Sequence, residues 1–150
     1  MTIRKATVND VKLLGDLFDS YRVFYKKEPD PAGAQQFVSE RITQNESVIY
    51  VAEHDDHLLV GFVQLYPLFS STRMKRLWLL NDLYVQPEYR GLGVSVALID
   101  AAKELCRTTE SCGMMLETAK GNIIGNKLYQ KTGFALDADH NYFEWEVKSV

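Results

Sequence analysis

The stretch LLNDLYVQPEYRGLGVS (residues 79–95) decides the fold, because it predicts a buried strand, a short turn and a glycine loop that opens a helix. Residues 77–85 are apolar and aromatic over the length of a strand buried on both faces. Pro87 ends this strand. From Val94 onward the apolar residues recur with the spacing of one helix face, so the period of the pattern changes between the two elements.

The loop between this strand and this helix has the features of an anion site. Gly91 and Gly93 carry no side chain, so the backbone N–H groups of residues 91–95 can point outward at the positive end of a helix. Arg90 places a cation beside them. Phosphate is the most natural ligand, but a dinucleotide loop would need a glycine where Val96 stands, and the Gly-Lys-Ser/Thr of a Walker loop is absent.

The loop fits the pattern Arg-x-x-Gly-x-Gly/Ala, with Ser95 at the position that is usually Gly or Ala. At this loop the chain resembles the GNAT family of acetyl-CoA-dependent N-acetyltransferases. A second motif, Asn-x-x-small-x-x-Leu-Tyr followed by Gly-Phe, resembles the closing helix of the same family. It consists of Asn122, Gly125, Leu128, Tyr129, Gly133 and Phe134, with Gly125 in place of the usual Ala.

The remaining patterns predict one α/β domain over residues 1–150. Strands are expected at residues 2–5, 47–53, 58–69, 77–85, 113–118 and 142–147, and helices at 11–25, 31–44, 94–105 and 122–133. Gly61, inside a strand, predicts a bulge or a close backbone contact. The resemblance implies the GNAT fold, a mixed central sheet of six to seven strands that is flanked by about four helices and splayed between its central strands.

Composition and charge exclude several classes of protein. The chain is 46% hydrophobic and 25% charged with a net charge of −3, which favours a globular protein and argues against nucleic-acid or membrane-surface binding. Cys106 and Cys112 are expected to be reduced thiols in a cytoplasmic protein, and no signal peptide or membrane span is predicted. His54 and His57 lie in a polar turn, where solvated side chains are commoner than a metal site, so no metal is expected.

The resemblance implies that acetyl-CoA is bound by three groups of residues. The pyrophosphate cradle is formed by Arg90, Gly91, Leu92, Gly93, Val94 and Ser95. The strand edge that pairs with the pantetheine amides consists of Leu83, Tyr84 and Val85, and a backbone N–H near Leu83 or Tyr84 would stabilise the oxyanion. The closing helix contributes Asn122, Asn126 and Tyr129, which share one face.

Acetyl transfer to an amine poses two proton problems. An alkyl ammonium must lose a proton before it attacks, and Asp82 and Glu117 are candidate bases, directly or through water, although each also suits a structural ion pair. The departing thiolate needs a donor, and the resemblance implies Tyr129. Asn81 stands where polyamine acetyltransferases of the family tend to carry a glutamate.

The acceptor is expected to be a small molecule with a primary amine. The candidate acceptor residues are Tyr21, Phe24, Tyr25, Tyr66, Asn81 and Asp82, although the aromatic end of the first helix also suits core packing. The chain also resembles the histone- and polyamine-type bacterial subgroup of the family, which is compatible with a homodimer. Two alternatives stay open: a non-catalytic acyl-CoA sensor or binding module, and an acetyltransferase acting on lysines of proteins or peptides.

Overall fold

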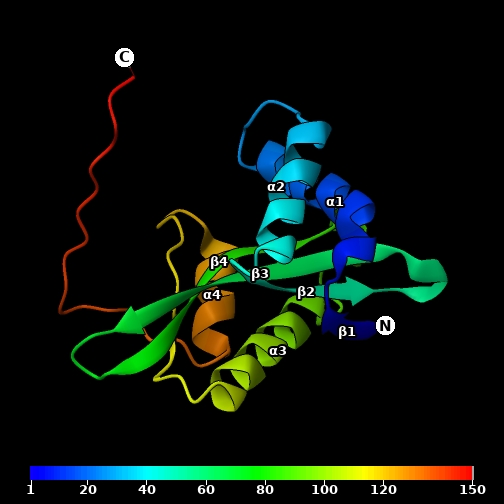
Figure 1. Cartoon of the computed structure of the whole chain (residues 1–150). Helices are drawn as coiled ribbons and strands as arrows, with labels where there is room; N and C mark the ends of the chain where they lie inside the picture. Colours follow the sequence, from blue (N-terminus) through cyan, green and yellow to red (C-terminus); the bar gives the residue numbers. More distant parts are fainter. Residues whose placement is uncertain (150) are drawn as a thin grey trace. The chain divides into compact units, whose positions relative to one another are not determined.

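A five-stranded sheet in the order β1-β2-β3-β4-β5 is the framework of residues 1–117 in the computed structural model, which describes residues 1–149 (Figure 1). Its strands are β1 (Thr2–Lys5), β2 (Val48–Glu53), β3 (Leu59–Ser70), β4 (Lys75–Val85) and β5 (Met114–Met115). Neighbouring strands are antiparallel except β4 and β5, which are parallel. The mixed α/β class is therefore confirmed, but the predicted count of six to seven strands is wrong.

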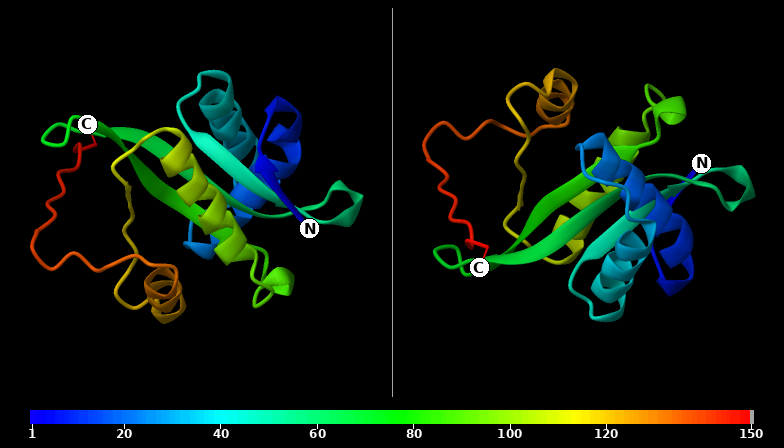
Figure 2. Two further views of the ribbon diagram at one scale, coloured as in Figure 1. Left: turned by 90° about the horizontal axis from the view of Figure 1, so that it is seen from below. Right: turned by 90° about the horizontal axis from the view of Figure 1, so that it is seen from above.

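Helices cover both faces of this sheet. Figure 1 shows α1 (Val11–Phe24) and α2 (Pro31–Thr43) on one face and α3 (Val94–Thr108) on the other, and Figure 2 shows the same arrangement from below and above. The core under α1 and α2 includes Leu14, Phe18 and Val38, whereas α3 buries Leu98 and Ile99. These residues recur at helical spacing, which is why the sequence pattern predicted the helices correctly.

Local caps fix where the first two helices begin. A 3₁₀ turn (Val8–Asp10) precedes α1, and its capping box is formed because Thr7 N donates to Asp10 Oδ2 (2.7 Å). Asp30 Oδ1 accepts from Gly33 N (3.0 Å), and Pro31 stands at the first turn of α2. Two further 3₁₀ turns, Asp55–His57 and Pro87–Tyr89, lie between strands β2 and β3 and after β4.

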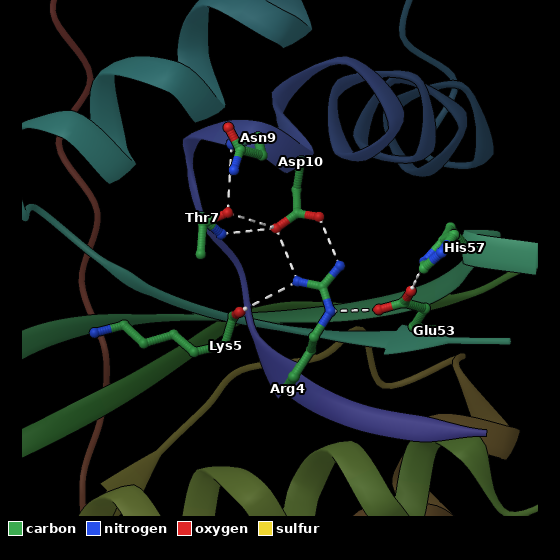
Figure 3. Close-up of polar contacts among 7 residues, drawn as sticks. All are labelled: Arg4, Lys5, Thr7, Asn9, Asp10, Glu53 and His57. Carbon is green, nitrogen blue, oxygen red and sulfur yellow. Dashed lines mark hydrogen bonds and ion pairs between the residues drawn. The ribbon is translucent and has the colours of Figure 1, made fainter.

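An ion network joins β1 to the start of α1 and to the end of β2 (Figure 3). The Arg4 guanidinium donates to Asp10 (Nη2 to Oδ1, 2.7 Å) and to Glu53, and Glu53 also pairs with His57. Hydrogen bonds from Arg4 lower the pKa of both carboxyl groups, Asp10 and Glu53. The charged network therefore stabilises the N-terminal strand above the acid range.

Two irregular pairings shape the middle of the sheet. Across β3 and β4, Gln64 faces Asp82 and Leu65 faces Leu80, so Asn81 is an extra residue, a β-bulge. A second register shift lies beside Gly61, at which an added Cβ would come 2.9 Å from Tyr84 O. The prediction from Gly61, a bulge or a close backbone contact, is confirmed.

Strand β5 is much shorter than the predicted strand at residues 113–118. It pairs with β4 only through Trp78↔Met114 and Leu79↔Met115, and the chain then enters the polar, glycine-containing segment 117–121. Within the described residues β4 has no pairing with β5 beyond Leu79. The β5-facing edge of residues 81–85 is consequently unpaired, which matches the expected splay.

The second compact unit begins at Thr118 and contains α4 (Ile123–Lys131). Asn122 Oδ1 accepts from Gly125 N (3.1 Å), which confirms the predicted cap. At the other end Gly133 has a positive φ of 94°, and Phe134 N donates to Tyr129 O (2.9 Å) in a Schellman motif.

The closing strand predicted at residues 142–147 is wrong. The alternating pattern is present, but within residues 1–149 no strand pairs with it, and a strand exists only with a hydrogen-bonded partner. None of the helices in the described residues is both long and apolar enough to cross a membrane.

Candidate active site

The N-terminus of α3 has the geometry of an anion cradle. Gly91 and Gly93 adopt positive φ values of 76° and 80°, which glycine reaches without steric cost. Gly93 is the N-cap, and the first helical hydrogen bond of α3 is Ala97 N to Gly93 O (3.0 Å). The amides that precede Ala97 in the first turn have no intrahelical acceptor and face the helix start. An added Cβ at Gly91 or Gly93 would meet nothing within 4 Å, so the space before these amides is open and fits a pyrophosphate.

Arg90 is fixed beside this cradle by groups of β4 and α1. Its Nε donates to Val85 O (2.9 Å), and its guanidinium carbon lies 5.3 Å from the Phe24 ring centre and 5.6 Å from that of Tyr84. Such contacts over ring faces stabilise a cation. Phe24, which sequence reasoning placed in the acceptor pocket, thus lies next to the anion cradle. Its partnership with Arg90 was not predicted.

Strand β4 offers backbone rather than side chains at residues 83–85. Tyr84 and Val85 are buried, Tyr84 within an aromatic cluster that includes Tyr21 and Phe62. The edge that faces away from β3 is unpaired here, so its N–H and C=O groups, apart from Val85 O, which accepts from Arg90, are available to the amides of an extended ligand. This placement agrees with the pantetheine edge implied by Leu83, Tyr84 and Val85.

A buried polar network surrounds Asp82 beside the bulge. Gln64 Nε2 donates to Asp82 Oδ2 (2.7 Å), Ser47 Oγ donates to Gln64 Oε1 (2.8 Å), and Asn81 Nδ2 donates to Asp82 Oδ1 (3.1 Å). Burial first, and then the Asp82 charge, raise the pKa of the Tyr66 hydroxyl to about 12, so Tyr66 stays a neutral donor. Both carboxylate oxygens of Asp82 are engaged, and its orientation is fixed by these amides.

Sequence reasoning missed the roles of Gln64 and Ser47. The signal for Gln64 was available, since it is the one amide in the apolar run GFVQL at residues 61–65. A fully buried side chain amide needs partners, and Asp82 and Ser47 provide them.

A cavity of about 590 Å³ lies between α1 and α2. Its aromatic and charged lining consists of Phe18, Tyr21, Tyr25, Phe37, Arg22, Lys27 and Asp30. Of the predicted acceptor residues, Tyr21 and Tyr25 line it, with ring centres 5.0 Å apart, whereas Phe24, Tyr66, Asn81 and Asp82 do not. The buried Asp19 joins two of the lining residues, since it accepts from Arg22 (2.7 Å) and from Asp30 N (3.0 Å).

The other predicted catalytic and cofactor residues have simpler surroundings. Glu117 is exposed and lies beyond β5. In the second unit, the Tyr129 ring packs edge-on against Phe134 (5.7 Å) within the Schellman motif. Asn126 Nδ2 donates to Asn122 O (2.7 Å) and to Ala119 O (3.0 Å), so this side chain shapes the start of α4. The roles of these residues toward a cofactor stay predictions.

Comparison with known proteins agrees with the class that this fold and cradle define. The model of the acetyltransferase (GNAT) family matches residues 12–134, and the chain belongs to this family. It is an N-acetyltransferase, and members of the family act on amines of small molecules or peptides.

Three similar proteins extend the comparison. "Uncharacterized N-acetyltransferase YhfO" of Bacillus subtilis (strain 168) is 39% identical over 137 residues, 91% of each chain. A "probable acetyltransferase" of Haemophilus influenzae is 29% identical over 144 residues, 96% of this chain and 97% of that one. A crystal structure, also of a "probable acetyltransferase", is 37% identical and superposes with a TM-score of 0.94 over 99% of each chain.

Proposed function

We propose that this chain transfers the acetyl group of acetyl-CoA to a primary amine of a small molecule, with residues 1–150 working as one domain. The observation that carries the proposal is the open glycine cradle at the start of α3, which directly follows the unpaired edge of β4. The family match supports it, since residues 12–134 include most of the first compact unit and about half of the second.

The donor site needs three contributions from this chain. The first-turn amides of α3 bind the pyrophosphate, and Arg90, held by Val85 O and two rings, adds positive charge. The free edge of residues 83–85 pairs with the pantetheine amides. When bound, acetyl-CoA supplies the thioester carbonyl that the amine attacks. A backbone N–H near Leu83 or Tyr84 then hydrogen-bonds the developing oxyanion, an interaction worth about 3 kcal/mol elsewhere.

Proton transfer is assigned to three side chains. Asp82 and Glu117 are the two candidate bases: Asp82 is buried and oriented by Gln64 and Asn81, and Glu117 is exposed to water. Orientation favours Asp82 as the residue that attracts and aligns the ammonium and helps to pass its proton to a water molecule. We assign the donation of a proton to the departing thiolate to Tyr129, on the family motif.

The size and lining of the α1–α2 cavity support a small acceptor. Its volume of about 590 Å³ falls within the range of small-molecule sites. Aromatic rings provide an apolar surface for an alkyl or aromatic body, and Asp30 provides a carboxylate for a second amino group. We propose that the body of the acceptor occupies this cavity while its reactive amine points toward the bulge at Asn81.

Release of free CoA thiol in the presence of an amine panel tests the proposal. Turnover would be measured at pH values from about 6 to about 10 on spermidine, short diamines, free amino acids, aminoglycosides and a lysine-rich peptide. Alkyl amines begin to deprotonate toward the upper end of this range. We expect turnover on at least one small amine, with kcat/KM rising with pH. Turnover on the peptide alone would replace the proposed acceptor, and tight CoA binding with no turnover on any amine would favour a sensor module.

Matched variants assign the base. Asp82→Asn and Glu117→Gln each remove a charge and keep the shape of the side chain. The variant that lowers kcat/KM and flattens its rise with pH identifies the carboxylate on the proton path. If neither variant alters the pH profile, both carboxylates are excluded as bases.

A further inference from the structure

The cavity between α1 and α2 carries charges of both signs along one short stretch of chain. Arg22 and Lys27 are the cations of its lining, and Asp30 is its carboxylate. Arg22 lies in the last turn of α1, Lys27 in the loop that joins α1 to α2, and Asp30 at the N-cap of α2 (Figure 1). A ligand in this cavity therefore meets aromatic rings together with charges of both signs.

Arg22 is fixed by residues of its own helix and of the loop. Its Nη1 donates to Asp19 Oδ1 (2.7 Å) and to Glu28 O (3.1 Å), and Asp19 Oδ1 also accepts from Asp30 N (3.0 Å). These contacts hold the loop against α1, so this side of the cavity is formed before a ligand binds. Asp19 also balances the charge of Arg22. The charges left for a ligand are therefore mainly those of Lys27 and Asp30.

Lys27 and Asp30 both keep unused binding capacity. Lys27 N donates to Arg22 O (3.0 Å), but within residues 1–117 no hydrogen bond or ion pair engages the Lys27 ammonium. Asp30 Oδ1 caps α2 by accepting from Gly33 N (3.0 Å), and in the same part of the chain Asp30 Oδ2 accepts no hydrogen bond. A cation and a carboxylate at one cavity match a ligand that carries both charges, because each charge of the ligand then has a partner.

The distance from this cavity to Asp82 can be counted along the sheet. The Tyr21 ring centre lies 5.7 Å from that of Phe62 and 6.1 Å from that of Tyr84, and Phe62 faces Tyr84 across β3 and β4. The next pair on the same face is Gln64 and Asp82, which lies about 7 Å further along at about 3.4 Å per residue. A chain of roughly four to six single bonds of about 1.5 Å covers this distance.

We propose that the acceptor is a diamino acid, an α-amino acid whose side chain ends in a second primary amine. The inference rests on the proposed function, since the terminal amine is the one that is acetylated beside Asp82. The carboxylate of the acceptor binds the Lys27 ammonium, its α-ammonium binds Asp30, and its methylene groups cross the aromatic surface between the cavity and the bulge. A diamine without the carboxylate leaves Lys27 facing a like charge.

The reaction at the terminal amine is balanced without a further reagent. The amine nitrogen forms an amide bond to the acetyl carbon, and the thioester C–S bond breaks. The terminal ammonium gives up two protons, of which one passes to water with the help of Asp82 and the other goes to the departing thiolate. The α-amino group and the carboxylate of the acceptor take no part in bond formation.

Matched acceptors test the inference in the thiol-release assay. Cadaverine is lysine without its carboxylate, and 6-aminohexanoate is lysine without its α-amino group; putrescine stands in the same relation to ornithine. We expect L-lysine or L-ornithine to exceed its matched compounds in kcat/KM by about 5-fold or more, the effect of one charge pair about 4 Å apart in water. Mass spectrometry should locate the acetyl group on the terminal nitrogen. Diamines that react as well as the diamino acids, or acetylation of the α-nitrogen alone, would overturn the inference.

Two variants separate the roles of the charges. Lys27→Gln should raise KM for the diamino acid by about 5-fold or more with kcat unchanged, and should lower KM for cadaverine, because a repulsion is removed. Asp30→Asn keeps a capping side chain at α2 and should raise KM for the diamino acid but not for 6-aminohexanoate. Lys26→Gln is the matched control, since Lys26 is adjacent and does not line the cavity. If Lys27→Gln shifts KM equally for L-lysine and cadaverine, the carboxylate is not bound by Lys27.

Calorimetry with L-lysine and L-ornithine on the CoA-bound protein distinguishes failure of this inference from failure of the proposed function. We expect binding that Lys27→Gln and Asp30→Asn weaken and Lys26→Gln leaves unchanged. If neither diamino acid binds or reacts while another small amine is acetylated, the inference is wrong and the proposed function stands. If no amine is acetylated, the proposed function is wrong, and the inference fails with it.

Discussion

Placing a side chain at Gly93 tests the anion cradle more directly than any other change. Gly93 has a φ of 80°, and an added Cβ meets no atom within 4 Å. A substitution therefore causes no steric clash in the free protein and costs only the strain of a left-handed backbone, about 1–2 kcal/mol of stability. Gly93→Glu and Gly93→Gln cause the same backbone strain and introduce side chains of nearly the same size. They differ by one negative charge.

The charge sets the expected difference in affinity. Two unit charges about 4 Å apart repel by about 1 kcal/mol in water and by about 4 kcal/mol at an effective dielectric constant of about 20. Facing a pyrophosphate, Gly93→Glu should therefore bind CoA about 5-fold to about 1,000-fold more weakly than Gly93→Gln. Both should bind more weakly than the parent, because either side chain enters the space before the first-turn amides.

Titration calorimetry with CoA measures these affinities, and urea unfolding confirms that both variants are folded and equally stable. The difference in CoA affinity between the two variants should become smaller as the salt concentration rises above about 0.1 M. At that concentration the Debye length is about 10 Å, and it shortens as salt is added. If folded Gly93→Glu and Gly93→Gln bind CoA alike, no anion lies at this helix start. Parental affinity in both would place the cradle elsewhere.

Three further changes are predicted to act on separate parts of the molecule. Tyr129→Phe should keep CoA affinity, since the ring contact at the end of α4 survives. It should lower kcat by about 100-fold in the thiol-release assay. If kcat is unchanged while chemistry is rate-limiting, Tyr129 has a packing role only. The hydrogen bonds from Arg4 depress the pKa of Asp10, so its contribution to stability is present above the ordinary carboxyl pKa and is lost as pH falls through the lowered one. Asp10→Asn should therefore cost most near neutral pH and converge with the parent in urea unfolding once the pH falls below the lowered pKa; a constant difference would contradict this. Gly61→Ala brings a Cβ 2.9 Å from Tyr84 O and should lower the free energy of unfolding by about 1–3 kcal/mol, seen as an earlier urea midpoint; an unshifted midpoint would mean that the strands separate without cost.

The sequence predicted the elements that depend on local chemistry. The caps at Thr7, Asp30 and Asn122 and the glycine stop at Gly133 all lie where the pattern placed them, because each depends on residues only a few positions apart. The glycine loop at the start of α3 was predicted for the same reason.

Features that depend on distant partners were predicted less well. The alternation at residues 142–147 is a valid strand signal, but a strand also needs an edge to pair with, and no local pattern identifies that edge. Similarly, the aromatic run at the end of α1 could not show that Phe24 turns to Arg90 while Tyr21 and Tyr25 line a cavity. Those choices are made by the packing of α1 against α2 and β4.

The bulge at Asn81 gives the enzyme a position that can change without disturbing its frame. Its neighbours Leu80 and Asp82 are buried and matched across the sheet to Leu65 and Gln64, so altering either would affect the sheet. Asn81 has no cross-strand partner, and its side chain is exposed. Substitutions there should change stability by no more than about 0.5 kcal/mol, as at ordinary surface sites. A lineage could therefore exchange this one side chain while the fold stays the same, and the change would be felt at Asp82, which loses its hydrogen bond from Asn81.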